Sequence, residues 1–227
     1  MAVFGISDLH LTIANPEKDM AIFGEHWKNH TEKLLSNWNK IVGEEDVVLV
    51  AGDISWALRY EEAEKDIEFL NKLKGTKIFV RGNHDYWWRR KASCKINSQT
   101  PNNMIFLQGK SVCINDVWFT GTRGWRIENG TLKENSLKIF DREAEYLREG
   151  LKSIPSDSKY KIVMLHFPPF DEDFKFNVFA KILKEHKVDM LVYGHIHMGE
   201  YMDGNINEME YRYIAADFLN FSPRLLI

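Results

Sequence analysis

Five short apolar runs, each ended within two residues by glycine or by a polar residue, constrain the fold of this chain more than any other feature. They cover residues 3–6, 47–50, 78–80, 162–165 and 190–193. Each contains β-branched residues and has the length of a buried strand. Helical patterns separate several of the runs, which is the spacing of βαβ units. The sequence therefore predicts a central α/β core.

Four helices are predicted from apolar residues at helical spacing. The first has Asn15 as its cap and Pro16 at its first position, and it continues to Gly43. The other three are expected over residues 61–74, 137–151 and 177–187. By contrast, residues 103–120 and 201–214 alternate around turn formers, which predicts antiparallel hairpins, the second with a turn near Asp203-Gly204-Asn205.

Length and composition favour one soluble domain. The chain has 227 residues, 44% of them hydrophobic, and we expect a single domain over residues 1–227. The formal charge of −3 weighs against general nucleic-acid binding. No signal peptide or membrane span is evident, which predicts a cytoplasmic protein, and Cys94 and Cys113 are expected to be buried free thiols.

Side chains that can bind metal follow all five apolar runs at once. They lie in Asp8-Leu9-His10, Gly52-Asp53, Gly82-Asn83-His84-Asp85, His166 and Gly194-His195-Ile196-His197. Since the carboxyl ends of neighbouring strands converge on one crevice in an α/β sheet, these side chains can meet there. Residues two apart in an extended segment point the same way, so the two side chains of each Asp-x-His or His-x-His pair can present ligands to the same place. Carboxylate, imidazole and amide ligands without thiolate suit Mn, Fe, Co, Ni or Zn.

Each motif alone has an ordinary structural explanation. Gly52-Asp53 is a common turn, His166 could be a hydrogen-bonded core histidine, and Asp8 could cap a turn. Five such coincidences at five strand ends favour a shared site instead. His26 and His30 lie four apart without a third ligand nearby, so we expect them on an exposed helix face.

The motifs, taken in order, resemble those of the calcineurin-like metallophosphoesterases, and the resemblance extends from Asp8 to His197. It implies an α/β fold of the α+β type, a four-layer αββα sandwich with two mixed sheets face to face and helices outside. It also implies two divalent or mixed-valence transition metal ions. Asp8, His10 and His197 would hold one metal, Asn83, His166 and His195 the other, and Asp53 would bridge them. His84 would serve the leaving group, and Asp85 would orient the His84 imidazole.

Arginines between the Asn83 and His166 motifs are candidates for substrate binding. Arg123 and Arg126 open a polar stretch that reaches Glu134, and guanidinium groups suit phosphate. We expect a substrate-facing loop there. The run Arg89-Arg90-Lys91 is more typical of a solvated face.

The leading hypothesis is a metal-dependent hydrolase that uses a metal-bound hydroxide to attack a phosphomonoester or phosphodiester. The substrate would be a phosphorylated small molecule or a nucleotide-like compound. Ile54-Ser55-Trp56 stands where protein phosphatases of this family usually have Asp-Arg-Gly, which disfavours a protein phosphatase. Two alternatives stay open. One is a metal-binding scaffold of the same superfamily, and the other is a nuclease. Oligomeric state is not indicated by the sequence.

Overall fold

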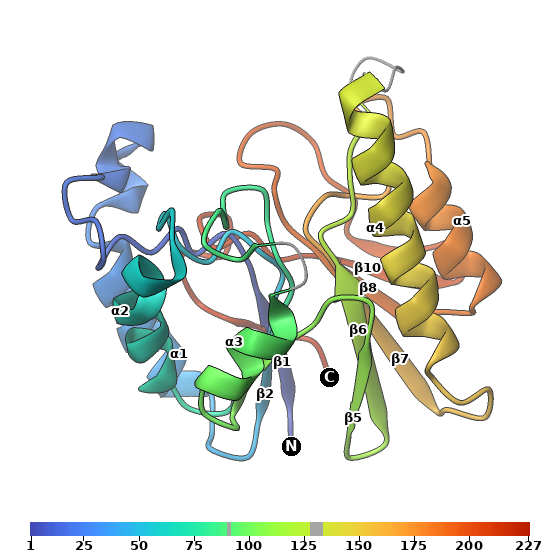
Figure 1. The fold of residues 1–227 in the computed structure, drawn as a ribbon, viewed down its shortest axis with the longest axis horizontal. Coiled ribbons are helices and arrows are strands. Elements are labelled where there is room, and N and C mark those ends of the chain that lie inside the picture. The colour runs from blue at the N-terminus through green and yellow to red at the C-terminus, as the bar shows by residue number, and fades with distance from the viewer. Residues whose placement is uncertain (90–91, 128–133) are drawn as a thin grey trace.

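The computed structural model describes residues 1–89, 92–127 and 134–227. Two mixed β-sheets pack face to face, and the helices cover their outer faces (Figure 1). The 3-10 turns η1 (Met20–Phe23) and η2 (Glu25–Trp27) lead into α1 (His30–Ile41), which lies with α2 (Tyr60–Asn71) and α3 (Ser93–Gln99) on one side. On the other side lie α4 (Glu134–Lys152) and α5 (Val178–Glu185). This arrangement confirms the predicted four-layer sandwich.

The first sheet has the order β11-β1-β2-β3-β4. Its members are β1 (Val3–Ile6), β2 (Val47–Val50), β3 (Thr76–Phe79), β4 (Met104–Phe106) and β11 (Arg224–Leu225). Strands β1 to β4 run parallel, and β11 pairs antiparallel with β1. The parallel strands therefore place their carboxyl ends at one edge of this sheet.

The second sheet has the order β5-β6-β7-β8-β10-β9. Its members are β5 (Ser111–Ile114), β6 (Val117–Thr122), β7 (Tyr160–Leu165), β8 (Met190–Tyr193), β9 (Gly204–Ile206) and β10 (Met209–Tyr213). Strands β6, β7, β8 and β10 run parallel, while β5 and β9 are antiparallel edge strands. A second set of parallel carboxyl ends results.

Alternate residues of the strands separate the interior into three apolar clusters. Val47 and Leu49 of β2 join the cluster between the two sheets, whereas Val48 and Val50 join the cluster beneath the N-terminal helices. A third cluster lies between the second sheet and helices α4 and α5. Because β2 is buried on both faces, its sequence is a continuous apolar run.

Several sequence-based expectations about elements are wrong. The single helix from Pro16 to Ile41 is interrupted, because Gly24 at φ 135° and Asn29 at φ 54° leave the helical region. The segment around Ile105 is no hairpin strand, since β4 extends the first sheet in parallel with β3. The β9–β10 turn lies at Asn207-Glu208, after the predicted turn residues. Helix α3 was not predicted.

Both cysteines, Cys94 and Cys113, are exposed rather than buried. His30 also differs from expectation. It is 6% exposed, and its Nε2 lies 3.1 Å from the His10 carbonyl oxygen, so this histidine packs beneath the loop after β1.

Candidate active site

The loops that follow β1, β2, β3, β7 and β8 carry the metal-competent side chains and are joined by main-chain hydrogen bonds. The Asp8 amide donates to the Gly52 carbonyl at 2.9 Å, and the His10 amide donates to the Asp53 carbonyl at 3.0 Å. Within the second sheet, the Gly194 amide donates to the His166 carbonyl at 3.3 Å, and between the two sheets the Ser7 amide donates to the Ile214 carbonyl at 2.8 Å. The predicted convergence of these loops is therefore present.

Four of the candidate residues have a left-handed backbone. The φ angles are 56° at Asp8, 45° at His10, 51° at Asp53 and 73° at His195. Such conformations are unfavourable for residues with a Cβ, and they persist where the surrounding structure holds them for a function. At these positions the strained backbone turns each side chain toward the common crevice.

Two glycines allow the loops to approach one another. A Cβ at Gly82 would lie 2.1 Å from Asp53 Oδ1, and a Cβ at Gly194 would lie 2.1 Å from Asp8 Oδ2. Any side chain at either position would displace a carboxylate of the site. The glycines are therefore required by the packing of the carboxylates.

Asp53 lies between two histidines that come from different sheets. Its Oδ2 is 3.7 Å from His10 Nε2 and 3.5 Å from His166 Nε2, while its Oδ1 accepts a hydrogen bond from the His84 amide at 2.8 Å. One oxygen is thus fixed by the protein, and the other faces both imidazoles.

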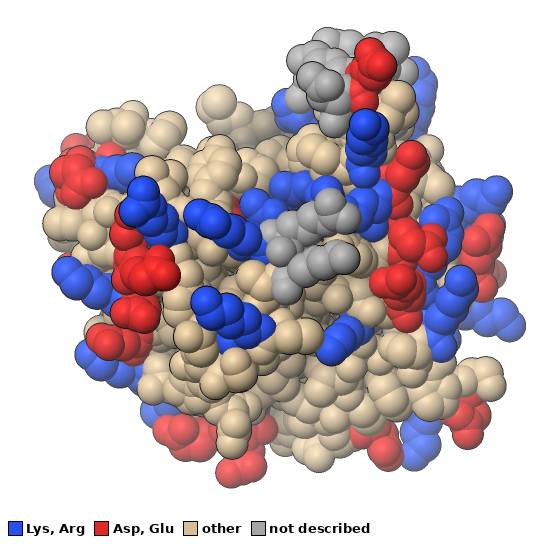
Figure 2. All heavy atoms as spheres, viewed as in Figure 1, with Lys and Arg blue, Asp and Glu red and all other residues tan. Residues whose placement is uncertain are grey.

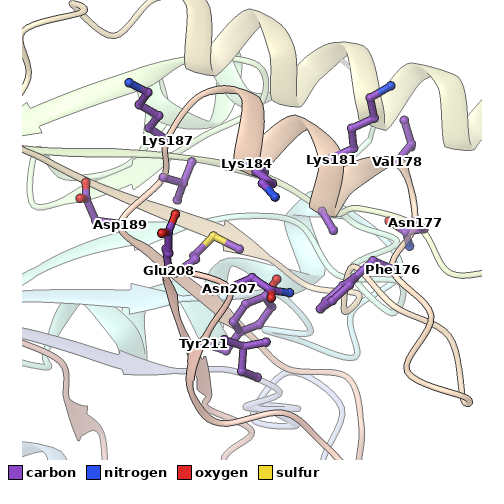
Figure 3. Close-up of a pocket in the computed structure, with 14 residues that line it drawn as sticks. Phe176, Asn177, Val178, Lys181, Lys184, Lys187, Asp189, Asn207, Glu208 and Tyr211 are labelled. Atoms are coloured by element: carbon purple, nitrogen blue, oxygen red, sulfur yellow. The ribbon is translucent and has the colours of Figure 1, made fainter.

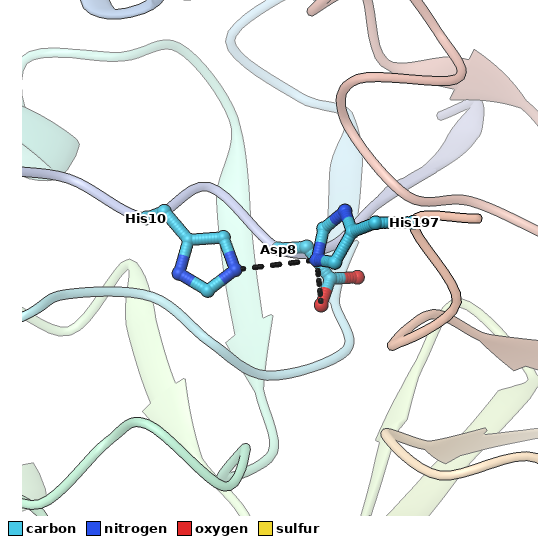
Figure 4. A group of neighbouring side chains, drawn as sticks. All are labelled: Asp8, His10 and His197. Carbon is cyan, nitrogen blue, oxygen red and sulfur yellow. Dashed lines mark hydrogen bonds and ion pairs between the residues drawn. The ribbon is translucent and has the colours of Figure 1, made fainter. Parts of the chain in front are cut away.

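Asp8 has one satisfied and one unsatisfied oxygen. Its Oδ2 accepts hydrogen bonds from the Ser7 hydroxyl and, at 3.0 Å, from the His195 amide. Its Oδ1 is buried without a hydrogen-bond partner and lies 3.7 Å from His197 Nε2. His10 Nε2 lies 3.4 Å from the same His197 nitrogen (Figure 4). A cation would satisfy all three groups, whose ligand atoms lie within 4.8 Å of one another.

His166 and Asn83 provide a second indication of a cation. His166 Nδ1 donates to the Ala51 carbonyl at 3.0 Å, which leaves a lone pair on Nε2. That nitrogen faces the Asn83 oxygen at 2.6 Å. Two acceptors at this distance repel each other unless a cation lies beside both. These residues therefore fit a metal ligand set.

Asp217 is a functional candidate that the sequence did not reveal. His197 Nδ1 lies 3.0 Å from Asp217 Oδ2, an arrangement in which the ring donates to the carboxylate and turns Nε2 toward Asp8. Carboxylates commonly orient metal-binding histidines in this way. No motif contains Asp217, which follows β10, so only the fold brings it to the site.

Burial sets the protonation of the ligands. It raises the pKa of Asp8 to about 6 and, together with the charges of Asp8 and Asp85, raises the pKa of Asp53 well above its usual value. Burial also lowers the pKa of His10 and His166 well below the usual range. The imidazoles of His10 and His166 are therefore neutral, and the neighbouring carboxylates are costly to ionise. A cation would stabilise the ionised carboxylates and accept the imidazole lone pairs.

His195 stands apart from the two closest groups of possible ligands. Those groups are Asp8 with His10 and His197, and Asp8 with Asp53 and His166. The His195 ring packs against Phe167 at 4.2 Å and His166 at 5.0 Å between centroids. Burial, with the charge of Arg126, lowers the pKa of His195 to about 3. The ring is therefore neutral and close to the second group.

The expected hydrogen bond between Asp85 and His84 is absent from the described contacts. The Asp85 carboxylate instead accepts from Ile54 N, Ser55 N, Gly82 N and Trp87 Nε1. These donors occupy both oxygens, so Asp85 joins the loops after β2 and β3. The His84 ring packs against Trp56 in a tilted arrangement with ring centroids 4.4 Å apart, and its Nδ1 is buried without a hydrogen-bond partner among the described residues.

The two candidate arginines differ in environment. Arg123 is 8% exposed, lies 3.7 Å from Glu143 and has its guanidinium 4.6 Å from the Trp125 ring centroid. Arg126 is exposed, and its charge lowers the pKa of His195. The rest of the predicted loop, residues 128–133, and Arg90-Lys91 lie outside the described residues.

A groove of about 910 Å³ lies elsewhere, between α5 and the β9–β10 hairpin (Figure 3). Lys181, Lys184 and Lys187 line one side of it. It contains none of the candidate site residues. Within the described ranges, no helix has the length and apolarity needed to cross a bilayer.

Comparison with known proteins gives one family and several relatives. The family model described as Calcineurin-like phosphoesterase matches residues 1–199. An uncharacterized protein of Methanocaldococcus jannaschii is 35% identical over 37% of this chain and 46% of its own length, so the match spans less than half of that relative. A probable cyclic nucleotide phosphodiesterase of Coxiella burnetii is 24% identical over 85% of this chain and 74% of its own.

Solved structures share the fold at low sequence identity. Phosphopantetheinyl hydrolase from Mycobacterium tuberculosis superposes with a TM-score of 0.60 and 13% identity, over 100% of this chain and 95% of that one. At this identity the likeness concerns the arrangement of strands and helices alone.

Proposed function

Because this chain belongs to the calcineurin-like phosphoesterase family and is thus a metal-dependent phosphoester hydrolase, we propose that its reaction centre holds two metal ions. Asp8, His10 and His197 would hold one ion, and Asn83, His166 and His195 would hold the other. Asp53 would serve both. The observation that carries this proposal is the position of Asp53 Oδ2, which faces His10 and His166 at 3.7 and 3.5 Å.

The donor set also supports the choice of metal. Imidazole, carboxylate and amide ligands suit Mn, Fe, Co, Ni or Zn in divalent or mixed-valence form. Such ions, when bound, lower the pKa of water toward neutrality and neutralise phosphate charge. The chain's own residues then have three tasks, which are to orient the ligands, to bind the phosphate and to assist the leaving group.

Orientation of the ligands is the task of hydrogen bonds beneath the site. The Ala51 carbonyl fixes the tautomer of His166, and Asp217 fixes that of His197. Asp85 holds the loops after β2 and β3 in register through four donors. These contacts place ligand atoms before any ion binds, which limits the reorganisation on binding.

His84 serves the leaving group. Its backbone amide is bonded to Asp53 Oδ1, which ties the residue to the bridging carboxylate. Burial, with the charges of His197 and Lys18, lowers the pKa of His84, so the ring is neutral at pH 7 and donates from one nitrogen. A hydrogen bond from this ring stabilises charge on the departing oxygen.

The substrate is a phosphomonoester or phosphodiester of small or moderate size, bound with the help of Arg123 and Arg126. Cyclic nucleotides belong among the compounds to test because of the Coxiella burnetii relative. A panel of chromogenic monoesters and diesters, cyclic nucleotides and single-stranded DNA should be assayed with Mn, Co, Ni, Zn and Fe.

We expect metal-dependent turnover of at least one ester, and we expect its loss in His10→Ala but not in His26→Ala. His26 is an exposed histidine outside the site and is the matched control. Turnover that persists in His10→Ala would contradict the assignment. Bound metal without any turnover would favour the scaffold alternative, and preference for DNA would favour a nuclease.

A further inference from the structure

Three arginines meet around one buried glutamate beside the proposed centre. Glu143 of α4 is 4% exposed, and its Oε1 lies 3.0 Å from the Arg142 guanidinium and 3.7 Å from that of Arg123. Its Oε2 accepts a hydrogen bond from the Thr122 hydroxyl. The charges of Glu143 and Arg142 also act on the Arg81 guanidinium, and the charge of Arg81 acts on Arg123. Three chain segments therefore contribute to one basic cluster.

In the described part of the chain, the cluster has one ion-paired carboxylate for its three guanidinium groups. Glu143 is the carboxylate shared by Arg123 and Arg142, and Arg81 has no carboxylate within 4.0 Å in the described part of the chain. The Arg81 Nε donates instead to the neutral Asp85 carbonyl at 3.1 Å. The Asp85 and Asp53 carboxylates form no ion pair with these arginines in the described part of the chain and act on Arg81 and Arg123 only through their charges. A buried guanidinium that lacks an ion pair of its own is costly, so the cluster is suited to a bound anion.

Arg123 carries the clearest sign of a missing ligand. Its side chain is 9% exposed, and its Nε is buried without a hydrogen-bond partner. Burial lowers the pKa of Arg123 to about 10, which keeps the group charged at neutral pH. The guanidinium is held over the Trp125 ring, so its orientation is fixed. A guanidinium fixed in this way can form two parallel hydrogen bonds to a phosphate.

The cluster adjoins the proposed metal ligands through the backbone. The Arg123 carbonyl accepts from the amides of His166 and Phe167 at 3.2 and 2.9 Å. Arg81 immediately precedes Gly82-Asn83. The charge of Arg123 also acts on Asp53, where it opposes the rise in the pKa of that carboxyl group. Lys and Arg side chains form a band across the upper middle of the face shown in Figure 2, and acidic side chains lie mostly at its sides and lower edge.

We propose that Arg81, Arg123 and Arg142 form a subsite for a second phosphate of the substrate, next to the phosphoryl group that reacts. The inference rests on the proposed function and narrows it to organic diphosphates and related compounds that carry two adjacent anionic groups. Glu143 is a positioning residue, since it holds two of the guanidinium groups together. A monoester with one phosphate reaches Arg123 at most and leaves the rest of this subsite empty.

Calorimetry with two non-hydrolysable probes tests the subsite on the metal-loaded protein. Methylenediphosphonate carries two phosphonates, and methylphosphonate carries one. Replacing Arg142 by Gln should weaken methylenediphosphonate binding about tenfold, which corresponds to one charge-assisted contact, and methylphosphonate binding less than about twofold. Arg148→Gln is the matched control, because Arg148 lies on the same helix with its guanidinium 3.5 Å from Glu145. Arg148→Gln should change neither dissociation constant. Chelation of the metal ions by the probe affects this variant and Arg142→Gln equally, so it cannot explain a difference between them.

Arg142→Lys keeps the charge and should recover part of the lost affinity for methylenediphosphonate. Equal weakening of both probes in Arg142→Gln, or no weakening of either, would overturn the subsite. Since calorimetry needs no turnover, discrimination between the probes in a protein that hydrolyses no ester would support the subsite while contradicting the proposed function.

Discussion

Asp217 Oδ2 lies 3.0 Å from His197 Nδ1, and the opposite nitrogen of the same ring lies 3.7 Å from Asp8 Oδ1. The Asp217 carboxylate, the His197 imidazole and the Asp8 carboxylate therefore form a continuous series of contacts. Burial alone would lower the pKa of His197, but the hydrogen bond to Asp217 and the charge of Asp8 raise it. Asp217 thus makes this imidazole more basic and fixes its direction.

Asp217→Asn should weaken metal binding at the site of His197 by about 10- to 100-fold, because the ring loses its orienting carboxylate. Competition with a chromogenic chelator measures the change. Asp116→Asn is the control, since Asp116 forms only an exposed ion pair with Lys159. Equal affinities in the Asp217 variant and the native protein would show that the contact does not support the ligand.

Metal affinity should fall as the pH falls below about 6. Burial raises the pKa of Asp8 to about 6, so below that pH a proton must leave the carboxylate before a metal binds. His10 and His166 have lowered pKa values and do not compete for protons in this range. Asp53 and His197 do compete, because their pKa values are raised, so the fall in affinity begins above pH 6. We expect the apparent affinity to fall at least about tenfold per pH unit below 6. Titrations at pH 5, 6 and 7 with one affinity would contradict this.

Replacing Asp85 by Asn should reduce the stability of the folded chain. The carboxylate accepts four hydrogen bonds, and the amide would place its NH₂ against a backbone donor. We expect the free energy of unfolding to fall by about 2 kcal/mol in denaturant titrations. Asp157→Asn, at an exposed position, should change it little. An unchanged stability in Asp85→Asn would argue against its role as a junction between loops.

His84→Ala should slow hydrolysis in proportion to the basicity of the leaving group. We expect a loss of about 100-fold or more for alkyl phosphoesters, whose basic departing oxygen depends on a hydrogen bond from the ring, and a much smaller loss for p-nitrophenyl esters. The comparison of kcat for both substrate types measures this, and metal content serves as its control. Equal losses for both leaving groups would assign His84 a structural role beside Trp56.

The strands that carry the site were predictable because burial on both faces makes their sequences continuous apolar runs. The bounds of β1, β2 and β8 agree with the predictions. The first helix was less predictable, because its apolar spacing continues through Gly24 and Asn29, whose backbone breaks it. Periodicity records which side chains are buried and does not record the φ angles between them.

The site was predictable to the extent that its residues follow strands. Asp8, Asp53 and His166 could be found in this way, since each comes within three residues of the end of an apolar run. Asp217 and Glu143 could not, because each acts through a contact with a residue that is distant in the sequence or on another element. The role expected for Asp85 failed for a related reason, since its hydrogen-bond partners depend on the packing of two loops.

The number of metal ions bound per chain, with and without the Asp53 carboxylate, tests the central claim most directly. Elemental analysis of the metal-loaded protein, paired with turnover of its best ester, should be carried out on the native chain and on Asp53→Asn. The account predicts two ions per native chain, and at most one ion with turnover reduced at least about 1000-fold in the variant. Full turnover with a single ion in the native chain, or two ions and unchanged turnover in Asp53→Asn, would contradict it.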